Sequence, residues 1–179
     1  MSPQIPSTDP VHFMVDLETL DTTPSSVILS IGTCVIPGYM DPADSDKFYV
    51  EVHVGSQYMR TQSISTIEWW KQQGNCPDHG TISLTDALRQ FRDYLLRYTT
   101  EPIIWCKGTD FDTAILAHAY KQMGSDTPWR YNNVRDFRTV KKLFADSLVV
   151  TAPNLNPHNA LADAIHQARE LRQLGLALK

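Results

Sequence analysis

Four acidic residues and one histidine carry most of the chemical information in this sequence. Asp16 and Glu18 end an apolar run, Asp112 opens a helix-like stretch, and His158 precedes Asp163 by five positions. Carboxylate oxygens are the ligands that hard divalent cations prefer, and a pair of such cations suits phosphodiester cleavage. If the fold brings the carboxylates together, the set predicts metal-assisted hydrolysis of phosphodiesters.

Each of these residues alone has an ordinary structural explanation. An isolated Asp-x-Glu on a strand usually belongs to a solvated face, and the dipole at a helix N-terminus favours an acid such as Asp112. Asp163 could be an exposed helical acid, and His158 could cap a helix or face solvent. The functional interpretation therefore depends on the whole set, in which each acid lies beside apolar residues at the start or end of a predicted element.

Periodicity indicates the elements that must position these residues. Residues 11–18 alternate so that Asp16 and Glu18 share one face of a predicted strand, because side chains on a strand repeat every two residues. Residues 27–36 and 48–54 predict two further strands, and the three would form an antiparallel meander.

Capping patterns and apolar runs predict the remaining elements. Ser65 with Glu68, and Ser83 with Asp86, have the spacing of capping boxes, so we expect a helix to begin at each. The other expected elements are a buried strand at 103–105, a helix at about 110–123, a short strand at Val134, a helix capped by Asp136, and a last helix at about 159–174.

Three strands followed by alternating helices and strands predict an α/β fold with a mixed five-stranded sheet flanked by helices. We expect residues 1–10 to be a flexible N-terminal tail and residues 11–179 to form a single domain, since the length suits one domain and the sequence has no internal repeat.

Composition narrows the class of protein. The chain is 42% apolar and 20% charged, lacks a run of roughly 18 apolar residues, and lacks a signal peptide, so we expect a cytoplasmic protein without a membrane partner. Three cysteines without CxxC spacing predict reduced thiols. A net charge of −4 argues against a non-catalytic nucleic-acid binder, but less against a nuclease whose site acids are neutralised by cations.

The order and spacing of the motifs resemble the DEDDh group of 3′→5′ exonucleases, over roughly residues 11–174. The three motifs are Val15-Asp16-Leu17-Glu18-Thr19, Phe111-Asp112 and His158-Asn159-Ala160-Leu161-Ala162-Asp163-Ala164. The third spacing is the most specific of them. Thr-Ile-Glu-Trp-Trp and Trp-x-Lys-Gly-x-x-Phe-Asp make the chain most similar to small bacterial exoribonuclease-like and phage exonuclease-like members.

The resemblance implies an RNase H-like fold and a two-metal mechanism. Two Mg²⁺ or Mn²⁺ ions would be held by Asp16, Glu18, Asp112 and Asp163, and His158 would take a proton from the attacking water. The substrate would be the 3′ end of single-stranded RNA or DNA, and the products nucleoside 5′-monophosphates. We favour RNA because the exoribonuclease-like members are the most similar, although the sequence does not indicate which residue would contact the 2′-OH.

The position of His158 can also be argued from the residues. Five residues at about 100° each would place His158 and Asp163 about 140° apart on a helix, so His158 is expected in the loop or first turn after Pro157. An imidazole there suits a general base, because its ordinary pKa is near neutrality. The resemblance and the frequency of two-fold oligomers are consistent with a homodimer, but the sequence predicts no interface.

Four further residues are candidates for contacting substrate. Leu17 and Thr19 flank the first pair of acids and are expected at the terminal nucleotide. Trp69 and Trp70 diverge by about 100° on a helix, so we expect one of them in the core. The other could stack on a base, although core packing is the commoner use of Trp; the sequence does not say which, and Trp70 is the candidate for a substrate contact. For Lys107, contact with a phosphate and exposure to solvent are equally expected.

One position departs from the family pattern. Many relatives carry an asparagine four residues before the acid of the second motif, where this chain has Gly108, so contacts near the terminal nucleotide are expected to differ. Two other functions remain open: a binding or scaffold protein that kept the fold without catalysis, and a phosphodiesterase for short oligonucleotides.

Overall fold

A mixed five-stranded sheet forms the centre of the computed structural model, which describes residues 9–77, 80–145 and 153–174. The strands are β1 (Val11–Thr19), β2 (Ile28–Val35), β3 (Lys47–Glu51), β4 (Pro102–Cys106) and β5 (Val134–Asp136). Their order is β3-β2-β1-β4-β5, with β1, β2 and β3 antiparallel and β1, β4 and β5 parallel. The predicted five-stranded mixed sheet is confirmed. The expected tail, residues 1–10, lies almost entirely outside the described residues.

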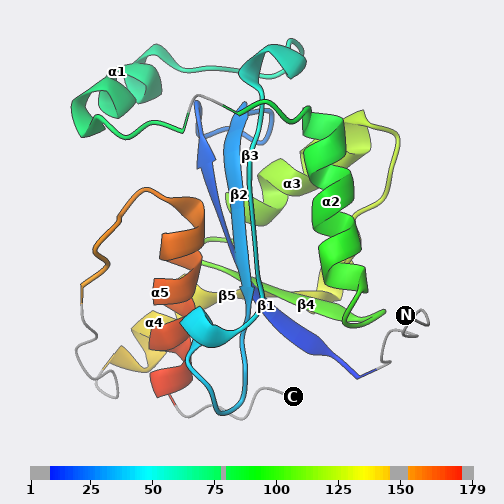
Figure 1. Cartoon of the computed structure of the whole chain (residues 1–179), viewed down its shortest axis with the longest axis vertical. Helices are drawn as coiled ribbons and strands as arrows, with labels where there is room; N and C mark the ends of the chain where they lie inside the picture. Colours follow the sequence, from blue (N-terminus) through cyan, green and yellow to red (C-terminus); the bar gives the residue numbers. More distant parts are fainter. Residues whose placement is uncertain (1–8, 78–79, 146–152, 175–179) are drawn as a thin grey trace.

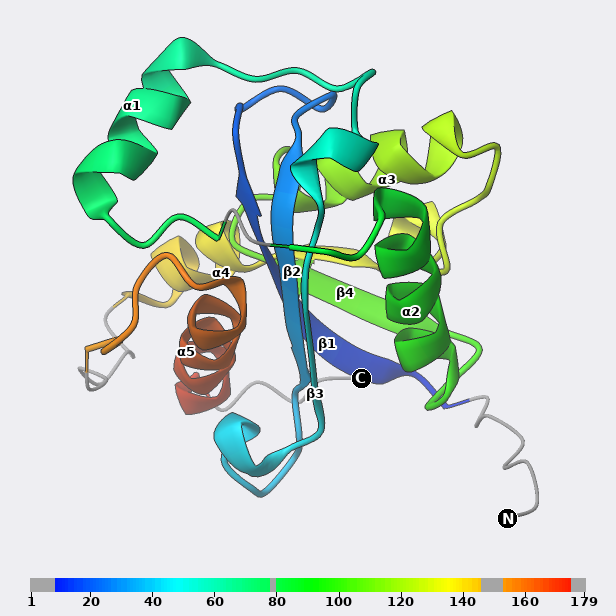
Figure 2. The same cartoon turned by 45° about the horizontal axis from the view of Figure 1, so that its top comes forward.

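Helices cover both faces of this sheet (Figure 1). They are α1 (Ile64–Gln73), α2 (Leu84–Leu96), α3 (Asp112–Gln122), α4 (Phe137–Leu143) and α5 (Ala160–Gln173). α2 and α3 pack against one face, α4 and α5 pack against the other, and α1 stands apart near one end of the sheet (Figure 2). Within the described ranges, no helix has the length and apolar character needed to cross a bilayer.

The alternation along β1 decides which layer each of its side chains meets. Phe13, Val15 and Leu17 are buried in the core made with α2 and α3, whereas Met14 is buried in the core made with α4 and α5. Asp16 and Glu18 have the same parity as Met14, so they point to the side of the sheet on which α5 lies. The predicted division of the strand into two faces is confirmed.

Gly32 lets α5 come close to the sheet. This residue is the β2 partner of Asp16, and a Cβ atom at its position would lie 2.2 Å from the backbone carbon of Ala160 and 2.2 Å from the backbone nitrogen of Leu161. Contacts this short do not occur in real proteins, so only glycine fits where the first turn of α5 crosses the sheet. The first turn of α5, which also carries Asp163, therefore lies directly over the strand pair that carries Asp16.

Local capping signals were accurate for two helices and wrong for a third. The Ser83 side chain accepts a hydrogen bond from the backbone N–H of Asp86, as predicted. Asp136 likewise caps α4 by accepting from the backbone N–H of Thr139. The capping box expected at Ser65 does not form, because α1 begins at Ile64 with Ser63 in the N-cap position and no side-chain cap.

The third predicted strand is shorter than expected. β3 ends at Glu51, Val52 pairs with Ile82 in an isolated bridge, and residues 54–56 form a turn of 3-10 helix. Alternating valines predicted a strand through residue 54, but pairing with a segment beyond α1 takes the chain out of the sheet. The end of β3 lies level with Glu18, because Glu51 pairs with Ser30 and Ser30 pairs with Glu18.

Candidate active site

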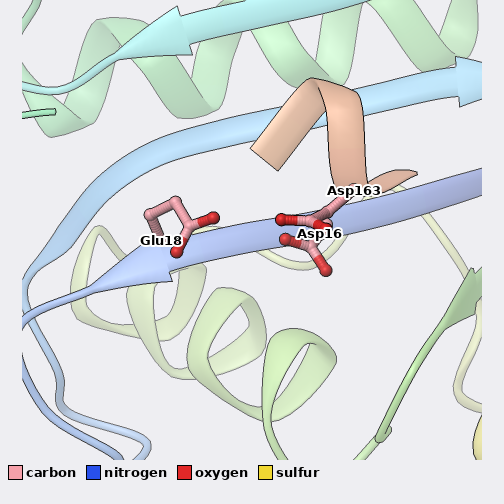
Figure 3. Close-up of side chains that lie close together, drawn as sticks. All are labelled: Asp16, Glu18 and Asp163. Atoms are coloured by element: carbon pink, nitrogen blue, oxygen red, sulfur yellow. The ribbon is translucent and has the colours of Figure 1, made fainter. Parts of the chain in front are cut away.

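Three of the predicted metal ligands converge at the C-terminal end of β1. One carboxylate oxygen from each of Asp16, Glu18 and Asp163 lies within 4.8 Å of the other two (Figure 3). Asp16 and Glu18 occupy alternate positions of β1, and Asp163 lies in the first turn of α5. The strand alternation and the close approach of α5 at Gly32 together bring acids 147 positions apart to one point.

Asp112 lies beside this group but is not one of the three. It is the first residue of α3 and is only 3% exposed, and its Oδ1 accepts a 3.0 Å hydrogen bond from the backbone N–H of Leu17. This bond attaches the start of α3 to β1 between the first two acids. The charge of Asp112 contributes to raising the pKa of Asp16, so the fourth acid is electrostatically part of the site.

Burial and mutual repulsion disfavour the ionised form of these acids. Burial, followed by the charges of Asp16 and Asp163, raises the pKa of Glu18 to about 9. Burial and the neighbouring carboxylates also raise the pKa of Asp16 well above its ordinary value, and burial raises that of Asp112. Buried like charges need positive charge close by if they are to ionise together.

The donor set fits a divalent metal. All the converging atoms are carboxylate oxygens, which Mg²⁺ and Mn²⁺ accept as ligands. Among protein cations, Lys107 lowers the pKa of Asp16 and Arg138 lowers that of Asp112, but neither is the largest influence on its acid. A divalent ion is therefore the counter-charge that this cluster is built to receive.

Two side chains that the sequence analysis did not single out hold the acids in place. Gln167 donates a hydrogen bond of 2.7 Å from Nε2 to Oδ1 of Asp16, and Asn154 donates one of 2.9 Å from Nδ2 to Oδ1 of Asp163. Gln167 follows Asp163 by four positions on α5, a spacing that puts both on one helix face and could have identified it. No sequence signal marked Asn154, which reaches the site from the loop before α5.

His158 occupies the predicted loop immediately before α5, whose N-cap is Asn159. Its backbone N–H donates a 2.8 Å hydrogen bond to Oδ2 of Asp163. Its φ of 63° lies in the left-handed region, which is uncommon for residues other than glycine. The imidazole packs against the ring of Trp69, with ring centroids 4.7 Å apart and planes at 86°.

A pocket of about 370 Å³ adjoins Glu18. Its walls include Leu17, Glu18, Thr19, Trp69, Trp70 and Phe111. Trp70 is only 3% exposed and its Nε1–H donates a hydrogen bond to the carbonyl of Thr19, whereas Trp69 is 37% exposed. Three of the predicted substrate contacts, namely Leu17, Thr19 and Trp70, therefore line one pocket, although Trp70 is mostly buried.

Lys107, the fourth predicted contact, is exposed on the loop after β4. Arg138 donates a 2.8 Å hydrogen bond to the backbone carbonyl of Lys107, and a Cβ atom on the intervening Gly108 would lie 3.0 Å from the same guanidinium. Two cations thus border the acidic cluster on the side of the second motif. A positive edge beside buried acids suits a phosphate backbone that must approach them.

Comparisons with known proteins agree with this geometry. A family model described as the 3′-5′ exoribonuclease Rv2179c-like domain matches residues 11–174. The exodeoxyribonuclease of Enterobacteria phage T4 is 26% identical over 156 residues, covering 71% of this chain and 69% of the phage protein.

Two solved structures share the fold. The nuclease domain of 3′hExo, a DEDDh family member bound to rAMP, has a TM-score of 0.60 and 13% identity, covering 92% of both chains. Cell-death related nuclease 4 (CRN-4) has a TM-score of 0.58 and 12% identity, covering 92% of this chain but only 63% of its own. This chain thus spans less than two thirds of CRN-4.

Proposed function

Because the chain belongs to the family of 3′-5′ exoribonuclease Rv2179c-like domains, and is thereby a 3′-5′ exonuclease, we propose that it removes nucleoside 5′-monophosphates from single-stranded nucleic acid in a metal-dependent reaction. The observation that carries the proposal is the meeting of Asp16, Glu18 and Asp163 oxygens within 4.8 Å. RNA is the proposed substrate because the family is described as exoribonucleases. The phage relative is an exodeoxyribonuclease, so DNA must be tested beside it.

Two Mg²⁺ or Mn²⁺ ions are the proposed cofactors, held by Asp16, Glu18, Asp112 and Asp163. Bound there, such ions would provide Lewis-acid stabilisation of the phosphate and acidify a water. The hydrogen bond from Leu17 to Asp112 and that from Gln167 to Asp16 would keep two of the acids in the orientation that binding requires.

His158 is the proposed general base for the attacking water. The bond from its backbone to Asp163 keeps the residue next to the acids, and imidazole is the side chain that most often serves as a general base. Leu17, Thr19 and Trp70 would contact the terminal nucleotide from the walls of the pocket, and Lys107 would contact a phosphate.

Release of mononucleotides from end-labelled strands tests this proposal. Asp16→Asn and Asp163→Asn keep the side-chain volumes but remove charge, so each should nearly abolish Mg²⁺- or Mn²⁺-dependent digestion. Asp110→Asn is the matched control, because Asp110 is exposed and lies two positions before Asp112. Full activity in either ligand variant would reject the assignment.

The same assay defines the substrate. Matched RNA and DNA of one sequence separate the two nucleic acids, and labelling at the 5′ end shows whether the strand shortens from its 3′ end. Dinucleotides run beside longer strands test the short-oligonucleotide phosphodiesterase, and tight binding without turnover in either metal would support the scaffold alternative. The single domain over residues 11–179, a homodimer and a cytoplasmic location stay predictions.

A further inference from the structure

Helix α1 is attached to the sheet beside the active site through Trp70. This helix stands apart from α2, α3, α4 and α5 (Figure 2), and Trp70 packs with Leu20, Val27 and Leu29 where the chain leaves β1. The indole Nε1–H donates a 2.9 Å hydrogen bond to the carbonyl of Thr19, the residue after Glu18. The position of α1 is therefore fixed relative to the end of β1 that carries the first two acids.

Trp69, the neighbouring residue, connects α1 to the loop before α5. Its ring lies 4.9 Å from that of Trp70 at 73° and 4.7 Å from the His158 imidazole at 86°. Both are edge-to-face arrangements at distances where aromatic rings attract one another. Three rings thus connect the end of β1 to the proposed general base.

A second contact joins the same two segments. Asn75, just after α1, donates a 3.1 Å hydrogen bond from Nδ2 to the carbonyl of Pro157, 82 positions away. His158 is therefore held by Trp69 through its ring, by Asp163 through its backbone N–H, and by Asn75 through the preceding peptide. A residue with a φ of 63° needs such surroundings, because this backbone conformation is unfavourable for side chains with a Cβ.

We propose that Trp69 is a positioning residue, which holds the His158 imidazole in the orientation that proton transfer requires. The proposal rests on the proposed role of His158 and goes beyond it by making α1 a part of the catalytic machinery. An imidazole on a loop rotates freely about two bonds unless something packs against it, and small misplacements of a catalytic group cost up to about 100-fold in rate. The Trp69 ring supplies that packing. Among the described residues, Trp69 makes no hydrogen bond to Asp16, Glu18 or Asp163.

A base-stacking role for Trp69 would give a different kinetic signature. Loss of a stacking platform weakens substrate binding and raises KM, whereas misplacement of a general base lowers kcat. For Trp69→Ala we expect kcat to fall about 10- to 100-fold with KM within about twofold of wild type. Trp69→Phe keeps an aromatic ring and should recover most of kcat, and Gln72→Ala, an exposed residue one turn along α1, should leave both parameters unchanged.

A double-mutant cycle with His158→Ala shows whether Trp69 acts through His158. If it does, Trp69→Ala costs nothing further once His158 is gone, so the two effects are non-additive. Equal losses in both backgrounds, a loss confined to KM, or an unchanged or raised kcat in Trp69→Ala would each overturn the positioning role. If His158→Ala itself keeps full activity, the general base is misassigned, and this result is distinct from failure of the Trp69 inference.

An NMR measurement tests the ring contact without catalysis. The His158 ring protons should show ring-current shifts in the full chain, and these shifts should shrink in Trp69→Phe and shrink further in Trp69→Ala, where only the Trp70 ring, with its centroid 6.3 Å from that of the imidazole, still contributes. Circular dichroism and thermal unfolding establish whether each variant is folded. If Trp69→Ala does not fold, the comparison of Trp69→Phe with wild type provides the test. His158 shifts that do not change in a folded variant would contradict the contact.

Discussion

Gln167 and Asp16 are joined by a 2.7 Å hydrogen bond across 151 positions of sequence. Gln167 is buried, and among the described residues its Oε1 has no hydrogen-bond partner. The one side-chain hydrogen bond seen for this amide is therefore the bond to Asp16, a proposed metal ligand. α5 thus contributes Asp163 directly and orients Asp16 through Gln167. One helix controls two of the three converging acids.

Replacing Gln167 should weaken metal binding. The amide donor favours the ionised form of Asp16, so Gln167→Met, which keeps the volume and removes the donor, should raise the Mg²⁺ concentration for half-maximal activity about tenfold. A Mg²⁺ titration of nuclease activity measures this. Gln173→Met, an exposed glutamine on the same helix, is the matched control. An unchanged Mg²⁺ requirement in Gln167→Met would argue against an orienting role.

Glu18→Gln should stabilise the metal-free protein while inactivating it. Burial and the nearby acids raise the pKa of Glu18 to about 9, so near pH 8 the folded chain without metal keeps this carboxyl protonated at a cost in free energy. A neutral amide removes that cost. We therefore expect Tm in EDTA to rise by about 2–8 °C, which corresponds to a gain of about 1–2 kcal/mol in the free energy of unfolding. Activity should fall about 10³-fold, which corresponds to a loss of about 4 kcal/mol in the stabilisation of the transition state by the metal.

Thermal unfolding in EDTA checks the first effect and the nuclease assay checks the second. Glu68→Gln removes an exposed acid from α1 and should change neither quantity. A lower Tm for metal-free Glu18→Gln would mean that the carboxylate is favourably placed even without a cation.

Metal should stabilise the fold more strongly as pH rises. The pKa of Glu18 is higher in the folded chain than its ordinary value, so the folded state binds more protons and the free energy of unfolding falls as pH rises from about 4.5 towards 9. A divalent cation binds the ionised acids and competes with these protons. The difference in Tm between Mg²⁺ and EDTA should therefore grow between about pH 6 and pH 9, and a difference that shrinks over this range would contradict the assignment.

Lys107 should contribute to substrate binding more than to chemistry. Its charge lies beside the acids on an exposed loop, so Lys107→Ala should raise KM about 3- to 10-fold and leave kcat nearly unchanged. The slope of log(kcat/KM) against log salt should become shallower by about 0.7, as for the loss of one phosphate contact with a single strand. Lys142→Ala, which removes an exposed lysine of α4, is the control. If log(kcat/KM) depends on log salt with the same slope in both variants, Lys107 does not contact the phosphate backbone of the substrate.

The close approach of α5 to the sheet makes Gly32 sensitive to a single methyl group. In Gly32→Ala the added Cβ would overlap backbone atoms of Ala160 and Leu161, so we expect a loss of about 3 kcal/mol in the free energy of unfolding. Gly38→Ala meets no atom within 4 Å and should be neutral or slightly stabilising. Urea unfolding compares the two, and similar stabilities would show that α5 can move away from β2 without cost.

Local patterns in the sequence predicted the elements that carry the acids. Alternation placed Asp16 and Glu18 on one face, and a cap at Ser83 was identified from two residues, because these features depend on neighbours in the chain. The start of α1 was predicted wrongly because two serines compete for the N-cap, and Ser63 is held by its backbone bond to Leu20. That contact is tertiary and leaves no trace in the local sequence.

The supporting residues were harder to predict than the ligands. Gln167 follows Asp163 by one helical turn, so helical geometry could have placed it at the site, but only the approach of α5 to β1 determines that it meets Asp16. Helical divergence of Trp69 and Trp70 correctly separated a buried ring from an exposed one. It could not reveal that the exposed ring would meet His158, since the loop that carries His158 is distant in sequence.

The converging acids come from β1 and α5, the first and last elements of the described fold. A ribosome must therefore translate nearly all of this region before the metal-binding cluster can exist. A nascent chain that displays only β1 to α4 lacks Asp163, Gln167 and the loop bearing His158, and so cannot assemble this cluster. The cluster is thus completed only by the last helix of the described fold.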